Sequence, residues 1–125
     1  DPTARIVAAG KSYGGRMASM AVAEGLEVDA LVYLGYPLHP PGAPEKLRAE
    51  HLPAIAAPQL FVQGSNDAFL QPLTQFEEVV ATCRDARVAW IDGGGHSFEV
   101  KGRKLPASDI GASLAPLLVD FVDRV

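Results

Sequence analysis

Short runs of apolar residues alternate along this chain with longer segments in which apolar residues recur at helical spacing. Four runs predict buried strands, because each is continuously apolar and is followed by glycine, proline or other turn residues. They occupy residues 6–9, 30–34, 60–62 and 88–91. Buried strands separated by helices are typical of a parallel sheet whose two faces are both covered by helices. The pattern therefore predicts an α/β fold with a parallel sheet of about four strands.

The segments between the strands predict helices. These are expected at residues 13–24, 72–83 and about 108–122. In the first helix Met17, Met20 and Ala21 lie at helical spacing, and Gly25 follows as a C-terminal cap. The second has an apolar stripe formed by Leu73, Phe76, Val79 and Val80. Pro116 predicts a kink or a delayed start in the third helix.

The composition is that of one globular domain spanning residues 1–125, with 48% hydrophobic and 21% charged residues. The net charge of −4 leaves no basic field that would attract nucleic acid or an anionic membrane. No apolar run approaches the roughly 20 residues that cross a bilayer, and residues 1–5 lack a secretory signal. The single cysteine, Cys83, excludes an internal disulfide and is expected to be a small buried thiol. These features predict a cytoplasmic protein without nucleic-acid or membrane partners.

The candidate nucleophile, Ser12, lies in the sequence Gly-Lys-Ser-Tyr-Gly at residues 10–14, between the first strand and the first helix. A Gly-x-Ser-x-Gly motif in this context predicts a nucleophile elbow, a strained turn that lifts the Ser12 hydroxyl above the sheet. Close packing of the strand against the helix would leave little room for side chains at Gly10, Gly14 and Gly15. The Tyr13 amide, at the start of the helix, is expected to donate a hydrogen bond to an oxyanion. A phosphate-binding P-loop is excluded, because Arg5 stands where that motif requires glycine.

Two further residues complete a candidate catalytic triad with Ser12. Asp67 and His96 follow the third and fourth strands, and the carboxyl ends of parallel strands lie at one edge of a sheet. Ser12 is expected to attack a carbonyl, His96 to take its proton, and Asp67 to fix the tautomer of the imidazole. No cofactor and no metal are implied. Asp67 also fits a plain turn residue, and Asp92 is the competing acid, although it is expected to hold the glycine turn before His96.

The proline-rich residues 37–58 predict a loop with one helical turn at residues 45–50. This loop contains His39 and His51, which would need a third ligand to bind a metal. Nothing at a suitable spacing supplies that ligand, so surface or loop-packing roles are expected for both. Arg16, one helical turn after the serine, fits either a structural ion pair or a contact with a carboxylate or a substrate.

Four stretches of the sequence resemble one branch of the α/β-hydrolases. They are residues 10–16, 35–42 (Gly-Tyr-Pro-Leu-His-Pro-Pro-Gly), 45–52 and 95–98 (Gly-His-Ser-Phe). The branch is that of the dienelactone-hydrolase-related proteins grouped with the testis-expressed hydrolase-like protein and with a subunit of the non-specific-lethal histone acetyltransferase complex. The resemblance implies triad roles for Ser12, Asp67 and His96. Tyr13 departs from the methionine that is common after the nucleophile.

The resemblance implies a serine hydrolase that acts on a small-molecule carboxylic ester, thioester or small amide. Some members of the branch resemble interaction modules, so the alternative is a hydrolase-like scaffold that binds protein partners through residues 37–58. Because this fold places several strands before the elbow, the chain is expected to be the C-terminal half of the fold. The strand that carries Ser12 then lies at a sheet edge, which favours self-association or pairing with a missing N-terminal segment. The isolated chain is expected to have impaired activity, since an oxyanion donor would be missing.

Overall fold

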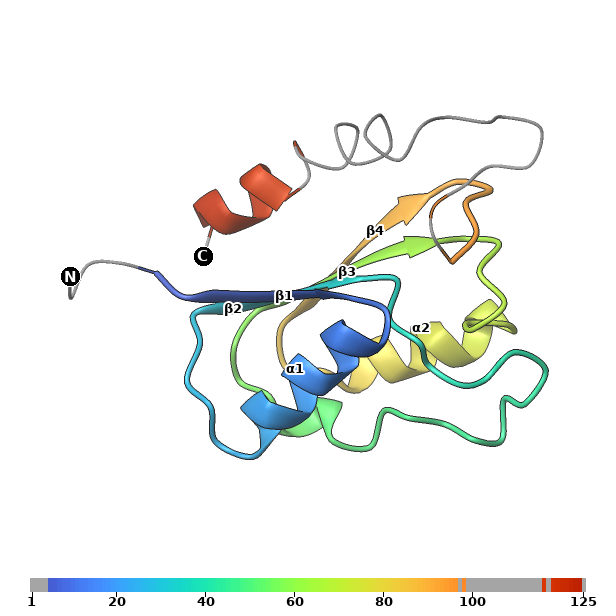
Figure 1. Ribbon diagram of the computed structural model, residues 1–125, viewed down its shortest axis with the longest axis horizontal. Coiled ribbons are helices and arrows are strands. Elements are labelled where there is room, and N and C mark those ends of the chain that lie inside the picture. The colour runs from blue at the N-terminus through green and yellow to red at the C-terminus, as the bar shows by residue number, and fades with distance from the viewer. Residues whose placement is uncertain (1–4, 97, 99–115, 117, 125) are drawn as a thin grey trace.

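The computed structural model describes residues 5–96, 98, 116 and 118–124, and its centre is a four-stranded parallel sheet (Figure 1). The strands are β1 (Val7–Lys11), β2 (Ala30–Leu34), β3 (Gln59–Gly64) and β4 (Ala86–Ile91). They lie in the order β1-β2-β3-β4, and every neighbouring pair is parallel. Each predicted strand is present, and the predicted α/β fold class is confirmed. Because all strands run the same way, their carboxyl ends lie at one edge of the sheet.

Helices cover both faces of the sheet, as the sequence predicts (Figure 1). The helices on one face are α1 (Tyr13–Ala23) and α2 (Leu73–Thr82). Helical residues 118–124 lie on the opposite face. Successive side chains of a strand point to opposite faces, so Tyr33 of β2 is buried in one cluster with Phe76, and its neighbour Val32 is buried in another with Phe121. The hydrophobic core therefore has two halves, one on each side of the sheet.

The predicted first helix is present as α1, but its apolar residues are not the ones that it buries. Met17, Met20 and Ala21, which lie at helical spacing, are exposed or half-buried. The buried residues of α1 are instead Gly15 and Ser19. A Cβ on Gly15 would lie 2.7 Å from the carbonyl oxygen of Gly10, so α1 packs too closely against β1 to admit a large side chain. Of the larger apolar residues of α1, Val22 packs partly buried against the core, whereas Met17 is exposed.

Gly25 ends α1, as predicted. Its φ of 123° lies in the left-handed region that favours glycine. The Gly25 amide donates to the Val22 carbonyl at 3.0 Å, and the Leu26 amide donates to the Ala21 carbonyl at 3.0 Å. These two bonds form a Schellman motif, which satisfies carbonyl groups at the end of the helix.

Two other expectations about helices need revision. Residues 45–50 form turns and irregular structure and no helical turn, because the Arg48 amide donates across the loop to the Leu38 carbonyl at 2.8 Å. A short 3₁₀ helix, η1 (Leu52–Ala54), follows this segment. Residues 108–115 and 117 of the predicted last helix lie outside the described residues, while Pro116 and the residues from 118 to 124 are helical.

The thiol that the sequence predicts to be buried is partly exposed, because Cys83 is half-buried rather than fully buried. Burial raises the pKa of its thiol above the ordinary value, so the thiol stays protonated at neutral pH.

Among the helices that the structure describes, none combines the length and the apolar character that crossing a lipid bilayer requires.

Candidate catalytic site

Ser12 lies on a strained turn between β1 and α1. Its φ is 52° and its ψ is −122°, a backbone conformation that costs a residue other than glycine about 1–3 kcal/mol. The surrounding structure holds the residue there from both sides. The Ser12 amide donates to the carbonyl of Leu34 at the end of β2, at 2.8 Å, and the Ser12 carbonyl accepts from the Gly15 amide at 3.0 Å. The sharp strand-to-helix turn predicted at this position is therefore present.

The glycines around the turn differ in how much they are needed. A Cβ on Gly10 would clash with the backbone of Gly14 and Gly15, and a Cβ on Gly15 would clash with the backbone of Gly10. A Cβ on Gly14, in contrast, would meet no heavy atom within 4 Å. The expectation that Gly14 is required for close packing is therefore wrong for the described residues. Gly10 and Gly15 make the close contact because β1 and α1 meet at those two positions.

Ser12, His96 and Asp67 are joined in series by short hydrogen bonds. The Ser12 Oγ lies 2.6 Å from His96 Nε2, and His96 Nδ1 lies 2.7 Å from Asp67 Oδ2. A carboxylate only accepts hydrogen bonds, so Nδ1 carries the proton and Nε2 is left to accept from the serine hydroxyl. The structure thus brings together the three side chains that the sequence places at the ends of β1, β3 and β4.

Asp67 is fully buried, and both of its carboxylate oxygens have a donor. Oδ2 faces His96, and Oδ1 accepts from the Phe69 amide at 2.8 Å. The competing acid, Asp92, is exposed. The glycine turn after β4 is held by Ser65, whose Oγ accepts from the Gly93 amide at 2.7 Å. The acid that contacts the imidazole is therefore Asp67.

Phe69 and Gly35 fix the position of the His96 ring, and neither was among the predicted site residues. The Phe69 ring stacks on the imidazole, with centroids 4.1 Å apart and planes 27° apart. Gly35 has a φ of 74°, and a Cβ there would lie 2.8 Å from the His96 carbonyl oxygen and 3.5 Å from the ring. The signals in the sequence were an aromatic residue two positions after Asp67 and the glycine that opens the Gly-Tyr-Pro segment.

The two histidines of the proline-rich loop have packing roles. His39 is buried, and its ring nitrogens lie 2.8 and 2.7 Å from the carbonyl oxygens of Pro40 and Gln71. His51 Nε2 lies 2.7 Å from the Ser19 hydroxyl of α1. In the portion of the chain that the structure describes, no group of three or more His, Cys, Asp or Glu side chains is arranged to hold a metal ion.

A cavity of about 180 Å³ opens beside the triad. Two of its lining residues contact the triad directly: Tyr13 follows Ser12 in the chain, and Phe69 stacks on His96. Other parts of its wall come from the proline-rich loop and from Arg16. The cavity therefore lies next to the candidate triad.

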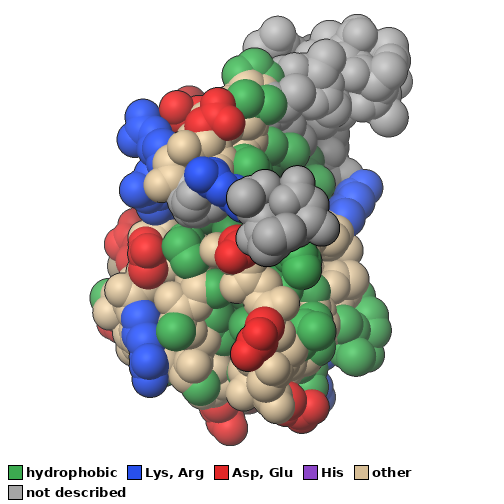
Figure 2. Space-filling view, turned by 90° about the vertical axis from the view of Figure 1, so that its left-hand side faces the viewer, with side chains coloured by type: hydrophobic (Ala, Val, Ile, Leu, Met, Phe, Trp, Pro, Cys, Tyr) green, Lys and Arg blue, Asp and Glu red, His purple; other side chains and the backbone are tan. Residues whose placement is uncertain are grey.

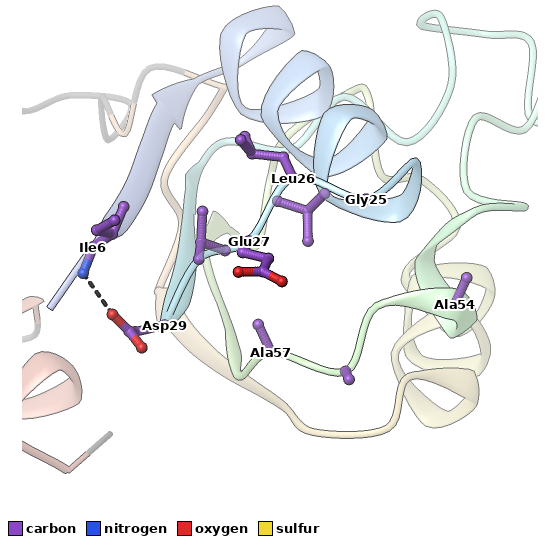
Figure 3. Close-up of a pocket in the computed structure, with 10 residues that line it drawn as sticks. Ile6, Gly25, Leu26, Glu27, Asp29, Ala54 and Ala57 are labelled. Atoms are coloured by element: carbon purple, nitrogen blue, oxygen red, sulfur yellow. Dashed lines mark hydrogen bonds between the residues drawn. The ribbon is translucent and has the colours of Figure 1, made fainter. Parts of the chain in front are cut away.

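A larger cavity, of about 540 Å³, lies at the amino ends of the strands (Figure 3). Among its lining residues, Asp29 accepts a hydrogen bond from the Ile6 amide at 2.6 Å, which ties the start of β1 to the start of β2. Figure 2 shows this end of the molecule, where apolar and acidic side chains are interspersed and no histidine is visible among the described side chains. The larger cavity lies at the opposite end of the strands from Ser12, and its lining contains no nucleophile paired with a base.

A parallel α/β sheet that carries a strained serine at one strand end, in line with a histidine and an acid, defines a site of the α/β-hydrolase type. Residues 1–114 match the family described as alpha/beta hydrolase domain, and the chain belongs to that family.

Solved structures with the same fold support this assignment. Dienelactone hydrolase from Anabaena variabilis is 27% identical, with a TM-score of 0.61 over 89% of this chain and 46% of that one. The esterase domain of a Rhodothermus marinus protein is 14% identical, with a TM-score of 0.69 over 95% of this chain and 61% of that one. An alpha-beta serine hydrolase homologue from Coxiella burnetii is 23% identical, with a TM-score of 0.59 over 76% of this chain and 42% of that one. The last two show the fold alone, and the chain spans only 42–61% of the length of these three proteins.

Proposed function

We propose that the chain carries the nucleophile, the base and the acid of a serine hydrolase of esterase type, which acts on carboxylic esters, thioesters or small amides. The observation that carries this proposal is the unbroken series from Ser12 Oγ to His96 to Asp67, with bonds of 2.6 and 2.7 Å. The strained backbone of Ser12 supports it further. Strain of this kind persists in proteins where the surrounding structure enforces it, and it clusters at functional sites.

In the proposed reaction the Ser12 oxygen attacks the substrate carbonyl as His96 Nε2 takes the hydroxyl proton. Asp67 stabilises the resulting imidazolium through its bond to Nδ1. The carbonyl oxygen bears the developing negative charge, and the bond to the leaving group breaks as His96 returns the proton to it. Water then attacks the acyl-serine by the same route and releases the acid.

The Tyr13 amide is the proposed donor to the oxyanion. Tyr13 is the first residue of α1, and its amide has no acceptor among the residues whose placement is described. In α/β-hydrolases a second amide comes from a loop that precedes the strand of the nucleophile. A form of the protein without that second amide is expected to turn over about 10²–10³-fold more slowly, which is the typical cost of losing one oxyanion donor.

The proposal is tested by labelling with a fluorophosphonate probe, which reacts with an activated serine. We expect the protein to be labelled, and Ser12→Ala to abolish the label. Ser19→Ala, a control that removes a buried hydroxyl elsewhere on α1, should retain it. Labelling that persists in Ser12→Ala, or its absence from a full-length form of the protein, would contradict the proposal.

The finer assignment, to the dienelactone-hydrolase-related branch with the testis-expressed and non-specific-lethal relatives, is also proposed. It is supported by the 27% identity to dienelactone hydrolase.

A scaffold function through residues 37–58 has less support, because that loop is bound to its own chain. Its contacts include a Gln75 side-chain bond to the Pro44 carbonyl at 2.9 Å and a Tyr36 hydroxyl bond to the Arg48 carbonyl at 2.7 Å.

We also propose that β1 pairs with a further strand, either of a second copy or of an additional segment of the same protein. β1 lies at the edge of the described sheet, and Ile6 beside it is 61% exposed. Edge strands with apolar neighbours favour pairing. Light scattering of the isolated chain should give a mass above 13.2 kDa that rises with concentration. Ile6→Lys should lower that mass, whereas Val119→Lys on the C-terminal helix should not; a concentration-independent monomer would disprove self-pairing.

A further inference from the structure

The cavity beside Ser12 combines apolar walls with two cationic side chains. Its walls include Pro37, Pro40 and Phe69, and the two cations are Arg16 and Arg48. No aspartate or glutamate is among the described residues that line it. The chain as a whole has a net charge of −4, so the concentration of positive charge at this one place requires an explanation.

Arg16 has an unused hydrogen-bond donor. Its Nε atom is buried and has no hydrogen-bond partner among the residues that the structure describes. The side chain also lacks a carboxylate: the ion pairs of the described residues are His96–Asp67 and Arg124–Asp120. The structural ion pair that was one expectation for Arg16 is therefore not observed there, and the remaining expectation is a substrate contact. A buried polar group without a partner is costly, and a ligand that accepts a hydrogen bond would remove that cost.

Arg48 is an exposed residue that lines the same cavity as Arg16, and its backbone is held in place by two hydrogen bonds. The Tyr36 hydroxyl donates to the Arg48 carbonyl at 2.7 Å, and the Arg48 amide donates to the Leu38 carbonyl at 2.8 Å. Burial raises the pKa of Tyr36 to about 12, so this hydroxyl remains a donor at neutral pH. The Gly-Tyr-Pro segment at residues 35–37 thus has two effects: Gly35 makes room for His96, and Tyr36 fixes the loop that carries Arg48.

The positive charge of Arg16 helps to lower the pKa of a neighbouring histidine. The pKa of His51 is lowered first by burial and second by the Arg16 charge. Glu50 and His51 line a neighbouring cavity that also includes both arginines, so Glu50 is an acid that has to be considered as a partner of the arginines. It forms no ion pair within 4.0 Å with either arginine in the described structure. Within the described part of the chain, neither guanidinium group is therefore paired with a carboxylate, and the Arg16 group lies 5.8 Å from the centroid of the Tyr13 ring.

We propose that this cavity binds a carboxylate carried by the substrate, so that the preferred substrates are esters or thioesters of small acids with a second carboxylate. The inference rests on the proposed hydrolase function. A volume of about 180 Å³ accommodates roughly six water-sized groups, which suits a short dicarboxylic acyl chain. Guanidinium forms paired hydrogen bonds with carboxylate and phosphate alike. The small size and apolar walls of the cavity favour carboxylate, which is the smaller and less highly charged anion.

The kinetic test uses two esters that differ chiefly in charge, 4-nitrophenyl pentanoate and the 4-nitrophenyl monoester of succinic acid. Arg16→Gln should lower kcat/KM for the succinate ester by about 10- to 100-fold, the range for hydrogen bonds to charged groups. The pentanoate ester should change by less than about threefold. Arg87→Gln, which removes an exposed positive charge on β4, is the matched control and should affect neither. Equal losses on both esters, or no loss on the succinate ester, would overturn the inference.

A binding measurement separates this inference from the proposed function. The ¹⁵N–¹H signal of the Arg16 Nε group, assigned from its loss in Arg16→Gln, should shift saturably with monomethyl succinate and not with methyl pentanoate. A missing response overturns the anion site even if the enzyme is active. A stronger response to methyl phosphate overturns the choice of carboxylate. If Ser12→Ala hydrolyses both esters as fast as the unmodified protein, the hydrolase proposal fails while the binding result stands.

Discussion

Asparagine in place of Asp67 is expected to lower kcat for an ester about 10⁴-fold, the size of effect measured for this change in a serine protease triad. The buried carboxylate accepts from His96 Nδ1 at 2.7 Å and so keeps the proton on that nitrogen. An amide at this position can donate to Nδ1 instead, which places the proton on Nε2. His96 then has no lone pair with which to accept the proton of Ser12. Steady-state kinetics with a 4-nitrophenyl ester would measure the loss.

Asp92→Asn is the matched control for that variant. It makes the same change of charge four residues before His96, at an exposed position. It should alter kcat by less than about twofold, since the salt-screened field of an exposed charge is weak. Circular dichroism should show that both variants are folded, because an asparagine oxygen can still accept from the Phe69 amide. A large effect of Asp92→Asn with little effect of Asp67→Asn would show that the acid is assigned wrongly.

Gly10→Ala is expected to lower the free energy of unfolding by about 3 kcal/mol, at the upper end of the cost of overpacking. The new methyl group would overlap the backbone of Gly14 and Gly15. Backbone at the start of α1 cannot move without displacing the helix from β1. Urea denaturation followed by circular dichroism would measure the loss as a lower midpoint with an unchanged slope.

Gly14→Ala makes the same chemical change four residues later and is expected to act in the opposite direction. Gly14 lies within α1, has no heavy atom within 4 Å of an added Cβ, and is not among the glycines with a positive φ. Alanine should therefore raise the free energy of unfolding by about 0.5–1 kcal/mol through its higher helix propensity. Equal destabilisation by the two substitutions would disprove the close contact between β1 and α1.

Much of the architecture follows from local pattern. The continuous apolar runs predict all four strands, because a buried parallel strand needs apolar side chains on both faces. Gly25 predicts the end of α1, because only a residue that tolerates positive φ closes a helix in this way. The prediction of a helical turn at residues 45–50 was wrong, since the hydrogen bond from Arg48 to Leu38 comes from outside that local segment.

The sequence by itself determined where the strands and turns fall and which strand ends carry Ser12, Asp67 and His96, because those features depend on spacing along one segment at a time. Only the tertiary structure decided that α1 buries Gly15 and Ser19, that Phe69 stacks on His96, and that Arg16 and Arg48 share a cavity. These contacts join residues from different elements. They depend on how closely and at what register the elements pack, and neither quantity is contained in the periodicity of a single segment.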